Sequence, residues 1–509
     1  MLQPDHSTVL LAVAAILMGW CYFFLQRRKT GDHRRLPPCP VRPWPLVGNM
    51  FSLGEDIRAQ FKAWHKQCGD IYCLYFGNTL LVVVNGFTTI KKVFVQNGAV
   101  SSDRPRVFFN EVAGMGQAGL GFATGATWKD NRSTSLQILR EFGMGSTSNF
   151  LADTVRKETV CLVNKLVEKE GKTVDLLYFA RVSMANVILS MLIGRRFSYE
   201  DPRFKNAVER MINVAESARG AGAINFLPFL KYLPGDMFDA KKIQVNLKPF
   251  ADFLVEEIIE LESNGCSKSD TVERSADNFI SSYKRRQTEK LQSGKKTSLN
   301  YENMIKSALD LFAAGTETTS STIIWCVLFI LHSTDVQSKI HEELDREVGQ
   351  GRQPTMEDQK NLPYLGAVIK ETQRLASVLP FSVLHKTSKE IAIGDFVIPE
   401  GTTLMPSLDS VLHDPQIWGD DAEEFNPERF LDKDGNLIHR EEFIPFFVGP
   451  RYCVGEAMAK MELFLFLSSM FQRFNFVAID PENPPTLKPI IGVVSVPTPY
   501  KVLCVDRFK

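Results

Sequence analysis

The feature that most constrains this chain is a short stretch near its C-terminus, which reads Phe446-Phe-Val-Gly-Pro-Arg-Tyr-Cys-Val-Gly455. It places a thiol, Cys453, two residues beyond a cation, Arg451. A long apolar pattern typical of a helix follows at once, so Cys453 lies near a helix N-terminus, where the helix dipole and free N–H groups favour a metal-binding thiolate. Gly449 and Gly455 allow the backbone to approach a flat ligand closely, because neither carries a Cβ. The alternative is an inert, buried cysteine in a turn.

The pattern Phe-x-x-Gly-x-Arg-x-Cys-x-Gly resembles the haem-binding signature of the cytochrome P-450 superfamily. A cysteine thiolate is one recognised way to hold haem iron. The resemblance implies that Cys453 is the axial iron ligand of haem b (iron protoporphyrin IX) and that Arg451 binds a haem propionate. It also implies a fold that is mainly α with small β-sheets (α+β). The stretches Glu141–Gly145 and Gly455–Glu462 look most like microsomal family 2, with Pro450 where a basic residue is often found.

Length and composition fit a large globular body. The chain has 509 residues, of which 44% are hydrophobic and 23% charged, and no linker-like segment divides it after residue 50. The formal net charge is zero, which gives no support for a nucleic-acid partner. Nine scattered cysteines without a C-x-x-C pair predict neither a disulfide framework nor a zinc site.

The N-terminus predicts a membrane anchor. An uncharged, mostly apolar run extends from Thr8 to Leu25, and three cations follow at 27–29. Eighteen residues of helix span about 27 Å, close to the hydrocarbon thickness of the endoplasmic reticulum membrane. A cleaved signal peptide is the alternative, but no Lys or Arg precedes the run. The cations on its C-terminal side place the rest of the chain in the cytosol.

A proline-rich segment at 36–49 follows the anchor and predicts a stiff, extended spacer. It resembles the hinge of microsomal P-450s, with Cys39 where glycine is common. The predicted organisation is a single-pass signal anchor with its basic flank at 1–29, a hinge at 30–50, and one haem-thiolate catalytic domain at 51–509.

Two β-rich runs, Ile71–Phe76 and Leu80–Val84, are separated by Gly77-Asn-Thr79 and predict a hairpin. Residues 150–262 have the spacing of successive amphipathic helices, which a glycine- and proline-rich section at 220–234 interrupts. In that section Phe226, Leu227, Phe229 and Leu230 suit either membrane contact or core packing. The polar stretch 262–300 predicts solvated surface.

Trp128 and Arg132 lie four residues apart and would share one face of a helix, from which both could reach one carboxylate. The alternative is plain helix surface. The pair resembles the family's Trp-x-x-x-Arg element, which holds a haem propionate. By the same resemblance, Arg104 and His385 are further propionate contacts.

Residues 308–331 predict a long apolar helix that contains Ala313-Ala-Gly-Thr-Glu-Thr-Thr319. Small residues at 313–315 allow close packing against a planar cofactor, and Gly315 suggests a local distortion of the helix. Glu317 and Thr318 place a carboxylate and a hydroxyl in one turn, which suits proton relay. The segment resembles the family's oxygen-activating motif.

Glu371 and Arg374 form an i, i+3 pair of opposite charge. The resemblance implies that Arg429, in Phe425-Asn-Pro-Glu-Arg-Phe430, completes a buried network with them. Shared hydrogen bonds would satisfy charges that burial otherwise penalises. These three residues are therefore predicted to be structural.

The function that the resemblance implies is a membrane-anchored haem-thiolate monooxygenase. It would insert one atom of dioxygen into a small lipophilic substrate such as a steroid, terpenoid, fatty acid or xenobiotic, with Glu317 and Thr318 delivering protons. Family positions and apolar character suggest these pocket residues: Phe312, Ala313, Val378, Leu379, Phe381 and Val493. The chain has no ferredoxin-type cysteine set and no glycine-rich fingerprint in a strand-to-helix setting, so electrons should come from an NADPH-dependent flavoprotein reductase, with cytochrome b5 as an optional second donor.

Two other functions remain open at this stage. A haem-thiolate isomerase or dehydratase of peroxides would need neither reductase nor dioxygen, although the Glu317-Thr318 pair argues against it. A non-catalytic haem- or lipid-binding protein would consume no dioxygen. For the monooxygenase, the expected location is the endoplasmic reticulum membrane, with the catalytic domain facing the cytosol.

Overall fold

A computed structural model describes residues 35–108, 111, 116–144, 150–263 and 278–509, together with 14 and 18–19. Almost all of the predicted anchor, and its cations at 27–29, lie outside the described residues. Within the described residues, two helices are long and apolar enough to cross a membrane, Leu176–Ile193 and Tyr301–His332. Most of their apolar length is buried inside the protein, 78% and 83%, as expected of core helices. The division into anchor, hinge and catalytic domain stays a prediction.

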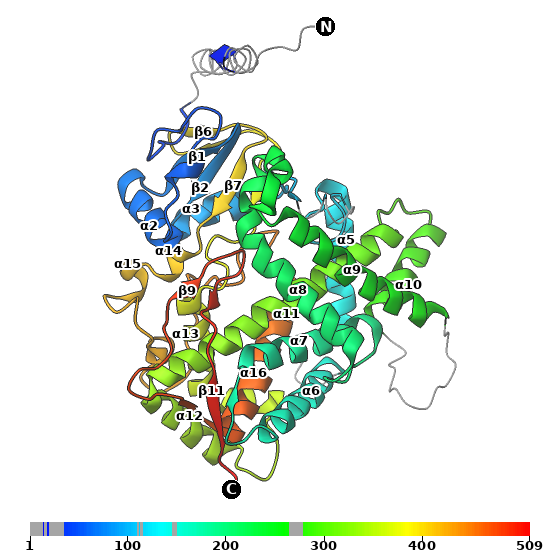
Figure 1. The fold of residues 1–509 in the computed structure, drawn as a ribbon, viewed down its shortest axis with the longest axis vertical. Helices are drawn as coiled ribbons and strands as arrows, with labels where there is room; N and C mark the ends of the chain where they lie inside the picture. Colours follow the sequence, from blue (N-terminus) through cyan, green and yellow to red (C-terminus); the bar gives the residue numbers. More distant parts are fainter. Residues whose placement is uncertain are drawn as a thin grey trace.

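Helices dominate the described chain (Figure 1). The α-helices are α2 (Ile57–Cys68), α3 (Phe87–Lys91), α5 (Gly125–Glu141), α6 (Phe150–Val167), α7 (Leu176–Ile193), α8 (Pro202–Gly220), α9 (Ala240–Ser263), α10 (Phe279–Gln292), α11 (Tyr301–His332), α12 (Thr334–Glu347), α13 (Pro363–Ala376), α14 (Asp409–Leu412), α15 (Pro415–Trp418) and α16 (Glu456–Arg473). Short 3-10 turns are η1 (Met50–Ser52), η3 (Ala221–Asn225), η4 (Pro228–Tyr232), η5 (Pro234–Asp236), η6 (Met356–Asn361) and η7 (Pro427–Phe430). The turn η2 (Lys92–Gln96) is π-helical and continues α3.

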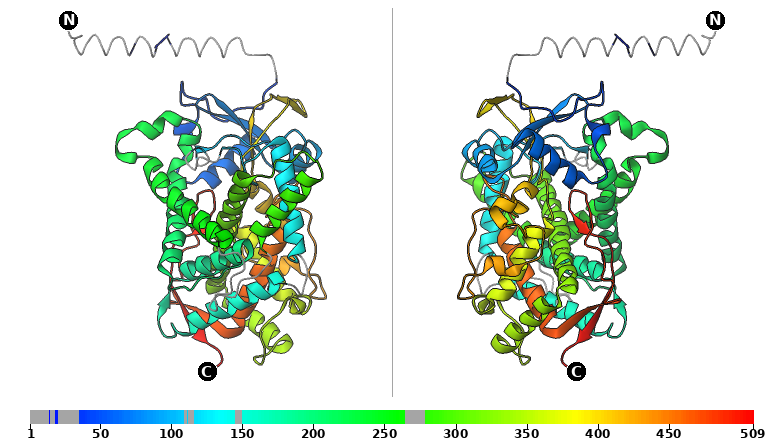
Figure 2. Two further views of the ribbon diagram at one scale, coloured as in Figure 1. Left: turned by 90° about the vertical axis from the view of Figure 1, so that its right-hand side faces the viewer. Right: turned by 90° about the vertical axis from the view of Figure 1, so that its left-hand side faces the viewer.

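The strands form four small sheets. They are β1 (Ile71–Phe76), β2 (Thr79–Val84), β3 (Thr173–Val174), β4 (His385–Lys386), β5 (Ile391–Ile393), β6 (Phe396–Ile398), β7 (Thr403–Pro406), β8 (Phe474–Ala478), β9 (Pro489–Ile490), β10 (Val496–Pro497) and β11 (Val502–Asp506). The sheet orders are β1-β2-β7-β4, β3-β11-β8, β5-β6 and β10-β9. The first two sheets lie at opposite ends of the molecule (Figures 1 and 2). The expected mainly helical fold with small sheets is confirmed.

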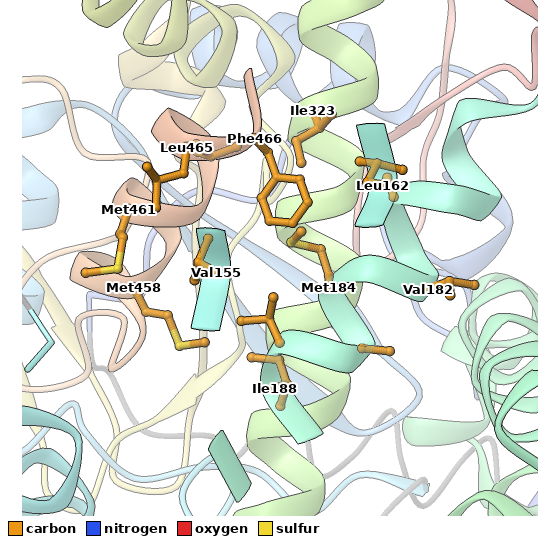
Figure 3. Packing of buried hydrophobic residues seen from close by; sticks show 14 of the residues in the cluster. Val155, Leu162, Val182, Met184, Ile188, Ile323, Met458, Met461, Leu465 and Phe466 are labelled. Atoms are coloured by element: carbon orange, nitrogen blue, oxygen red, sulfur yellow. The ribbon is translucent and has the colours of Figure 1, made fainter. Parts of the chain in front are cut away.

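The core is built around α11, which packs against α7 and α16 (Figure 3). Because α7 is apolar all round and almost wholly buried, it lacks the amphipathic pattern of a surface helix. Ile188 of α7 accounts for the glycine at position 315 of α11, because a Cβ on Gly315 would lie 2.6 Å from Ile188 Cδ1. Gly315 therefore sets the spacing of two helices, and α11 is continuous through this position rather than distorted.

The sequence makes predictions for both the β1–β2 hairpin and the stretch 262–300. The hairpin is present as predicted, with β1 and β2 antiparallel and Phe76 paired with Thr79. The stretch 262–300, expected to be solvated surface, is mostly exposed or half-buried where it is described, and residues 264–277 lie outside the described residues. It also contains α10, which one face anchors in the core. Its N-cap Asn278 accepts from Ser281 N, and Phe279 and Tyr283 are fully buried in the core. Two buried aromatic side chains anchor a helix whose other face is charged.

Candidate active site

The loop that carries Cys453 is fixed by close backbone packing. Cys453 N donates to Phe446 O at 2.9 Å, and Tyr452 N donates to Gly449 O at 3.0 Å. Gly449 has a φ of 77°, and a Cβ at this position would lie 2.0 Å from Phe94 O. Only glycine satisfies both constraints, so the loop lies directly on the π-helical turn η2.

Phe447 also fixes this loop against η2. It adopts a positive φ of 65°, which is rare for an aromatic residue. Its ring lies 5.2 Å from that of Phe94 and 5.2 Å from that of His385, and the Phe94 and His385 rings are 4.8 Å apart. This three-ring cluster joins η2, β4 and the cysteine loop.

Cys453 lies just before α16, whose N-cap is Gly455. Its side chain is accessible to solvent, yet enough protein surrounds it that burial raises the pKa of the thiol, while the Gly455 N–H and the Arg132 charge act in the opposite direction. This combination is typical of a side chain that faces an internal hollow. The sequence predicts that the helix N-terminus favours the thiolate, whereas burial acts against it here. A bound cation would favour the thiolate.

Arg451 is buried and is held entirely by backbone oxygens. Its Nε donates to Ser102 O at 2.8 Å, and its Nη2 donates to Ala123 O at 2.5 Å. Its guanidinium lies 3.9 Å from the centre of the Trp128 ring on α5. The backbone thus fixes the position of the Arg451 guanidinium, and none of these contacts neutralises its charge.

Two further arginines complete a buried cation cluster. Arg104 donates to Gly121 O and to Val383 and Leu384 O, while Arg132 donates to Tyr452 O at 2.7 Å. Among the described residues, no Asp or Glu oxygen pairs with the guanidinium groups of Arg104, Arg132 or Arg451. Burial followed by mutual repulsion lowers the pKa of Arg104 to about 9 and that of Arg451 to about 8.

Two buried nitrogens beside this cluster lack hydrogen-bond partners, namely Trp128 Nε1 and His385 Nε2. The other ring nitrogen of His385, Nδ1, lies 2.7 Å from Ser101 O. Burial and the Arg104 charge lower the pKa of His385 well below its usual value. Because His385 Nδ1 donates to a carbonyl, Nε2 of the neutral ring is an acceptor, and Trp128 Nε1 is the unpaired N–H donor. Unneutralised cations and this unpaired N–H fit a ligand that brings its own carboxylates. Haem, with two propionates and an iron for the thiol, meets this requirement.

On α11, the middle of the helix faces open space on one side. Ala313 and Ala314 are exposed although the flanking turns are buried. The Thr318 hydroxyl donates to Ala314 O at 2.8 Å, as a helical threonine commonly does. Glu317 points elsewhere and is gripped by Arg181 of α7 at 2.8 and 2.5 Å. The two predicted proton-relay residues are therefore neighbours in sequence but have different partners.

The suggested pocket residues are scattered. Phe312 is fully buried and stacks on Phe250 of α9, with ring centres 5.3 Å apart. Phe381 packs 4.8 Å from Phe61 and lines a separate pocket of about 940 Å³ beside α2. Val493 is 60% exposed. Val378 packs near Trp325, and its carbonyl, like that of neighbouring Leu379, accepts a backbone hydrogen bond. Of the set, Ala313 alone shares the open face of α11 with Ala314.

The predicted charge network is assembled. Glu371 Oε2 accepts from Arg374 Nε at 2.8 Å, and Glu371 Oε1 accepts from Arg429 Nε at 3.0 Å. Glu371 and Arg374 are fully buried, and Arg374 also donates to Leu412 O and Ala422 O. The network ties α13 to the segment that precedes the cysteine loop.

Sequence reasoning missed two buried groups. Arg181 is the only charged residue in α7, and a lone cation in an apolar helix signals a buried partner. Glu462 of α16 is buried, accepts from Thr319 Oγ1 at 3.1 Å, and has its pKa raised by burial to about 8. A carboxylate within the apolar run of α16 likewise indicates a buried polar contact.

The chain thus combines a thiol on a glycine-locked loop, buried cations that require carboxylates, and a long central helix with an open face. Together these features define a haem-thiolate protein. Residues 37–504 match the family model described as Cytochrome P450. The chain belongs to the cytochrome P450 family, whose members are haem-containing monooxygenases.

Curated relatives agree with this assignment over nearly the whole chain. Cytochrome P450 2D4 of Rattus norvegicus is 33% identical, covering 95% of each chain, and Cytochrome P450 2C23 of the same species is 34% identical, covering 98% of this chain and 99% of the relative. Cytochrome P450 2U1 of Bos taurus is 32% identical, covering 99% and 95%. All three are family 2 members by name.

Proposed function

We propose that this chain inserts one atom of dioxygen into a small lipophilic substrate, using electrons that originate from NADPH and arrive through a flavoprotein reductase. The observation that carries the proposal is the buried cation cluster of Arg104, Arg132 and Arg451 around an accessible Cys453. These residues form a cradle for a dianionic, iron-containing ligand. The Glu317-Thr318 turn lies on the helix that faces open space.

In the proposed site, Cys453 binds haem iron through sulfur. Arg451 and Arg132, stacked with Trp128, supply positive charge to the propionates, and Trp128 Nε1 gains its missing acceptor. Arg104 and His385 line the remaining edge. When bound, haem supplies the activation of dioxygen that no side chain can provide.

The protein's own contribution to the chemistry is proton delivery. Thr318 holds a hydroxyl at the open face of α11, where it can pass a proton. Glu317 is the adjacent carboxylate on the same turn, and its side chain is held by Arg181 of α7. Proton transfer through Glu317 therefore requires the side chain to leave Arg181.

An external electron donor is consistent with the structure. The letters Gly114-Met-Gly-Gln-Ala-Gly119 match a dinucleotide fingerprint in spacing alone. Gly119 packs against Lys306 of α11, and its N–H donates to Asn303 Oδ1 at 2.9 Å, so it does not form a turn between a strand and a helix. A reductase, with cytochrome b5 as a second donor, is the proposed partner.

A location at the endoplasmic reticulum membrane is supported by exposed apolar residues near the described N-terminal end. The segments that contain Leu46 and Leu227 both lie within 4 Å of the position of a Cβ on Gly77. The large exposed side chains of these segments are Trp44, Leu46, Phe51, Phe229, Tyr232, Leu233 and Met237. Such a patch suits contact with lipid. Leu227 is buried, so the 226–230 section serves both core and surface.

The decisive experiment compares purified wild-type protein, Cys453→Ser and the control Cys68→Ser. With reduced iron and carbon monoxide, the wild type and Cys68→Ser should show the red-shifted thiolate-type absorption, and Cys453→Ser should not. Wild-type protein without that absorption would overturn the assignment.

A second comparison separates the monooxygenase from an isomerase or a binding protein. With reductase and NADPH, Thr318→Ala should form less product per NADPH consumed, whereas Thr322→Val, one turn along α11, should not. Turnover of peroxides alone, or no dioxygen consumption at all, would contradict the proposal.

A further inference from the structure

A pocket of about 520 Å³ lies beside the cation cluster, and the proposed function does not use it. It lies between the segment 104–107, strands β2, β4 and β7, and the residues that follow η3. Its described lining residues are Thr79, Arg104, Pro105, Arg106, Val107, Gln117, Asn225, Phe226, Leu384, Lys386, Gly401 and Thr403. Its volume falls within the range of small-molecule sites.

The charge of this pocket is one-sided. Three cations line it, Arg104, Arg106 and Lys386, and no Asp or Glu is among its described lining residues. Arg104 is already held by three backbone oxygens. Arg106 is exposed and Lys386 half-buried, and no described carboxylate forms an ion pair with either. Both side chains are therefore available to an incoming anion.

The remaining walls are apolar or neutral. Val107, Phe226 and Leu384 provide apolar surface, and the Phe226 ring is itself held 4.8 Å from that of Phe76. Asn225 is fixed by accepting from Phe108 N at 2.7 Å. The pocket thus combines two unpaired cations with apolar walls, which suits an anionic group at the end of an apolar chain.

Its place next to the proposed haem site connects it with the substrate. Arg104 lines the pocket and also belongs to the cation cluster that surrounds the Cys453 loop, and Lys386 directly follows His385. Because Arg104 borders both, an acid whose head occupies this pocket would extend its apolar tail toward the proposed haem site. A membrane headgroup is the other possible anion, but the cations line a concave pocket, whereas a lipid surface is contacted by protruding side chains.

We infer that Arg106 and Lys386 form a head-group site for lipophilic carboxylates, so that this protein prefers long-chain acid anions over neutral molecules of the same length. This inference rests on the proposed function, because the acid is taken to be a substrate of the haem site. It narrows the substrate class and assigns two residues to specificity.

The test uses the full-length holoenzyme and two matched probes, dodecanoate and methyl dodecanoate. Their Kd values are measured from the spectral shift of the haem. The wild type should bind dodecanoate more tightly, and the preference should shrink as salt is raised. In the Arg106→Gln/Lys386→Gln double variant, the Kd of dodecanoate should rise about tenfold, while that of the ester should change by less than about twofold.

Lys66→Gln is the control, since Lys66 is an exposed cation on α2 outside this pocket. Thermal unfolding establishes that each variant is folded. The charge-reversed Arg106→Glu/Lys386→Glu variant should instead favour dodecyltrimethylammonium, a cation that cannot ligate iron.

Equal wild-type affinity for acid and ester would overturn the inference, as would an equal effect of Lys66→Gln. Loss of binding to phosphatidylserine vesicles with unchanged dodecanoate affinity would assign the cations to the membrane instead. Because every titration begins with a protein that shows the thiolate-type absorption, failure of this inference is distinct from failure of the proposed function.

Discussion

The guanidinium of Arg181 holds both carboxylate oxygens of Glu317, with Nε 2.8 Å from Oε2 and Nη2 2.5 Å from Oε1. Both side chains are buried, and the pair joins α7 to α11 one turn beyond the exposed alanines. A buried ion pair is costly to break from one side only, because the remaining charge has no water to replace its partner. The pair therefore sets both the stability of the core and the position of the proposed acid.

Replacing Arg181 alone should expose this dependence. Arg181→Met leaves Glu317 buried without a partner and should lower the free energy of unfolding by about 3–5 kcal/mol, measured by urea denaturation. The double variant Arg181→Met/Glu317→Gln should recover much of that loss. Lys62→Met, which breaks the exposed pair with Glu423, should change stability by at most about 1 kcal/mol. A single Arg181 variant as stable as the parent would contradict the prediction.

The unpaired Trp128 Nε1 predicts a role in retaining haem. Trp128→Phe keeps an aromatic ring beneath Arg451 but removes the N–H donor, so haem should transfer to an acceptor apoprotein about tenfold faster. Trp325→Phe is the matched control, because the Trp325 indole already donates to Ser495 O. It should affect stability without changing the rate of haem loss. Identical rates for Trp128→Phe and the parent would remove Trp128 from the haem site.

The Glu371 network should be necessary for folding. Glu371→Gln leaves the buried charge of Arg374 without a carboxylate and leaves Arg429 with Asp421 alone, so it should cost about 3–5 kcal/mol or prevent recovery of haem-loaded protein. Glu428→Gln, which removes the exposed partner of Lys339, should cost no more than about 1 kcal/mol. Holoprotein yield and urea midpoints measure both. Equal behaviour of the two variants would show that burial of the network has no energetic effect.

Glu462 predicts a pH dependence of stability. Burial raises its pKa in the folded protein to about 8, so it stays protonated there while the unfolded chain loses its proton above the ordinary value of 4.5. Stability should therefore fall as pH rises through this window, by up to about 1.4 kcal/mol per unit. Glu462→Gln should have a flatter profile and gain relative to the parent between pH 5 and pH 8. Parallel profiles from urea denaturation would show that Glu462 ionises normally.

Several parts of this structure could be predicted from sequence because their determinants are local. The β1–β2 hairpin follows from a glycine-containing turn between two β-rich runs. Glu371 and Arg374 lie one turn apart on α13, so their pairing is written in the spacing. The cysteine loop is likewise contained within ten consecutive residues.

Other parts depend on contacts between distant segments. Arg181 and Glu317 are separated by 136 positions, and neither spacing nor composition pairs them. Phe312 was expected to line the pocket, but on a helix the side chain one position away points about 100° elsewhere, and it packs on α9. The cations Arg106 and Lys386 come together only because β4 pairs with β7 beside segment 104–107. Sequence periodicity does not contain this information.

The contact between Gly449 and Phe94 has a consequence for engineering. At residue 449 there is room for a hydrogen atom and for nothing larger, since even a methyl group would overlap the carbonyl of Phe94. Libraries that aim to retune the iron ligand's surroundings should leave this position constant and diversify Val448 or Val454. Variation at 449 itself would move the sulfur before it altered the electronic character of the metal.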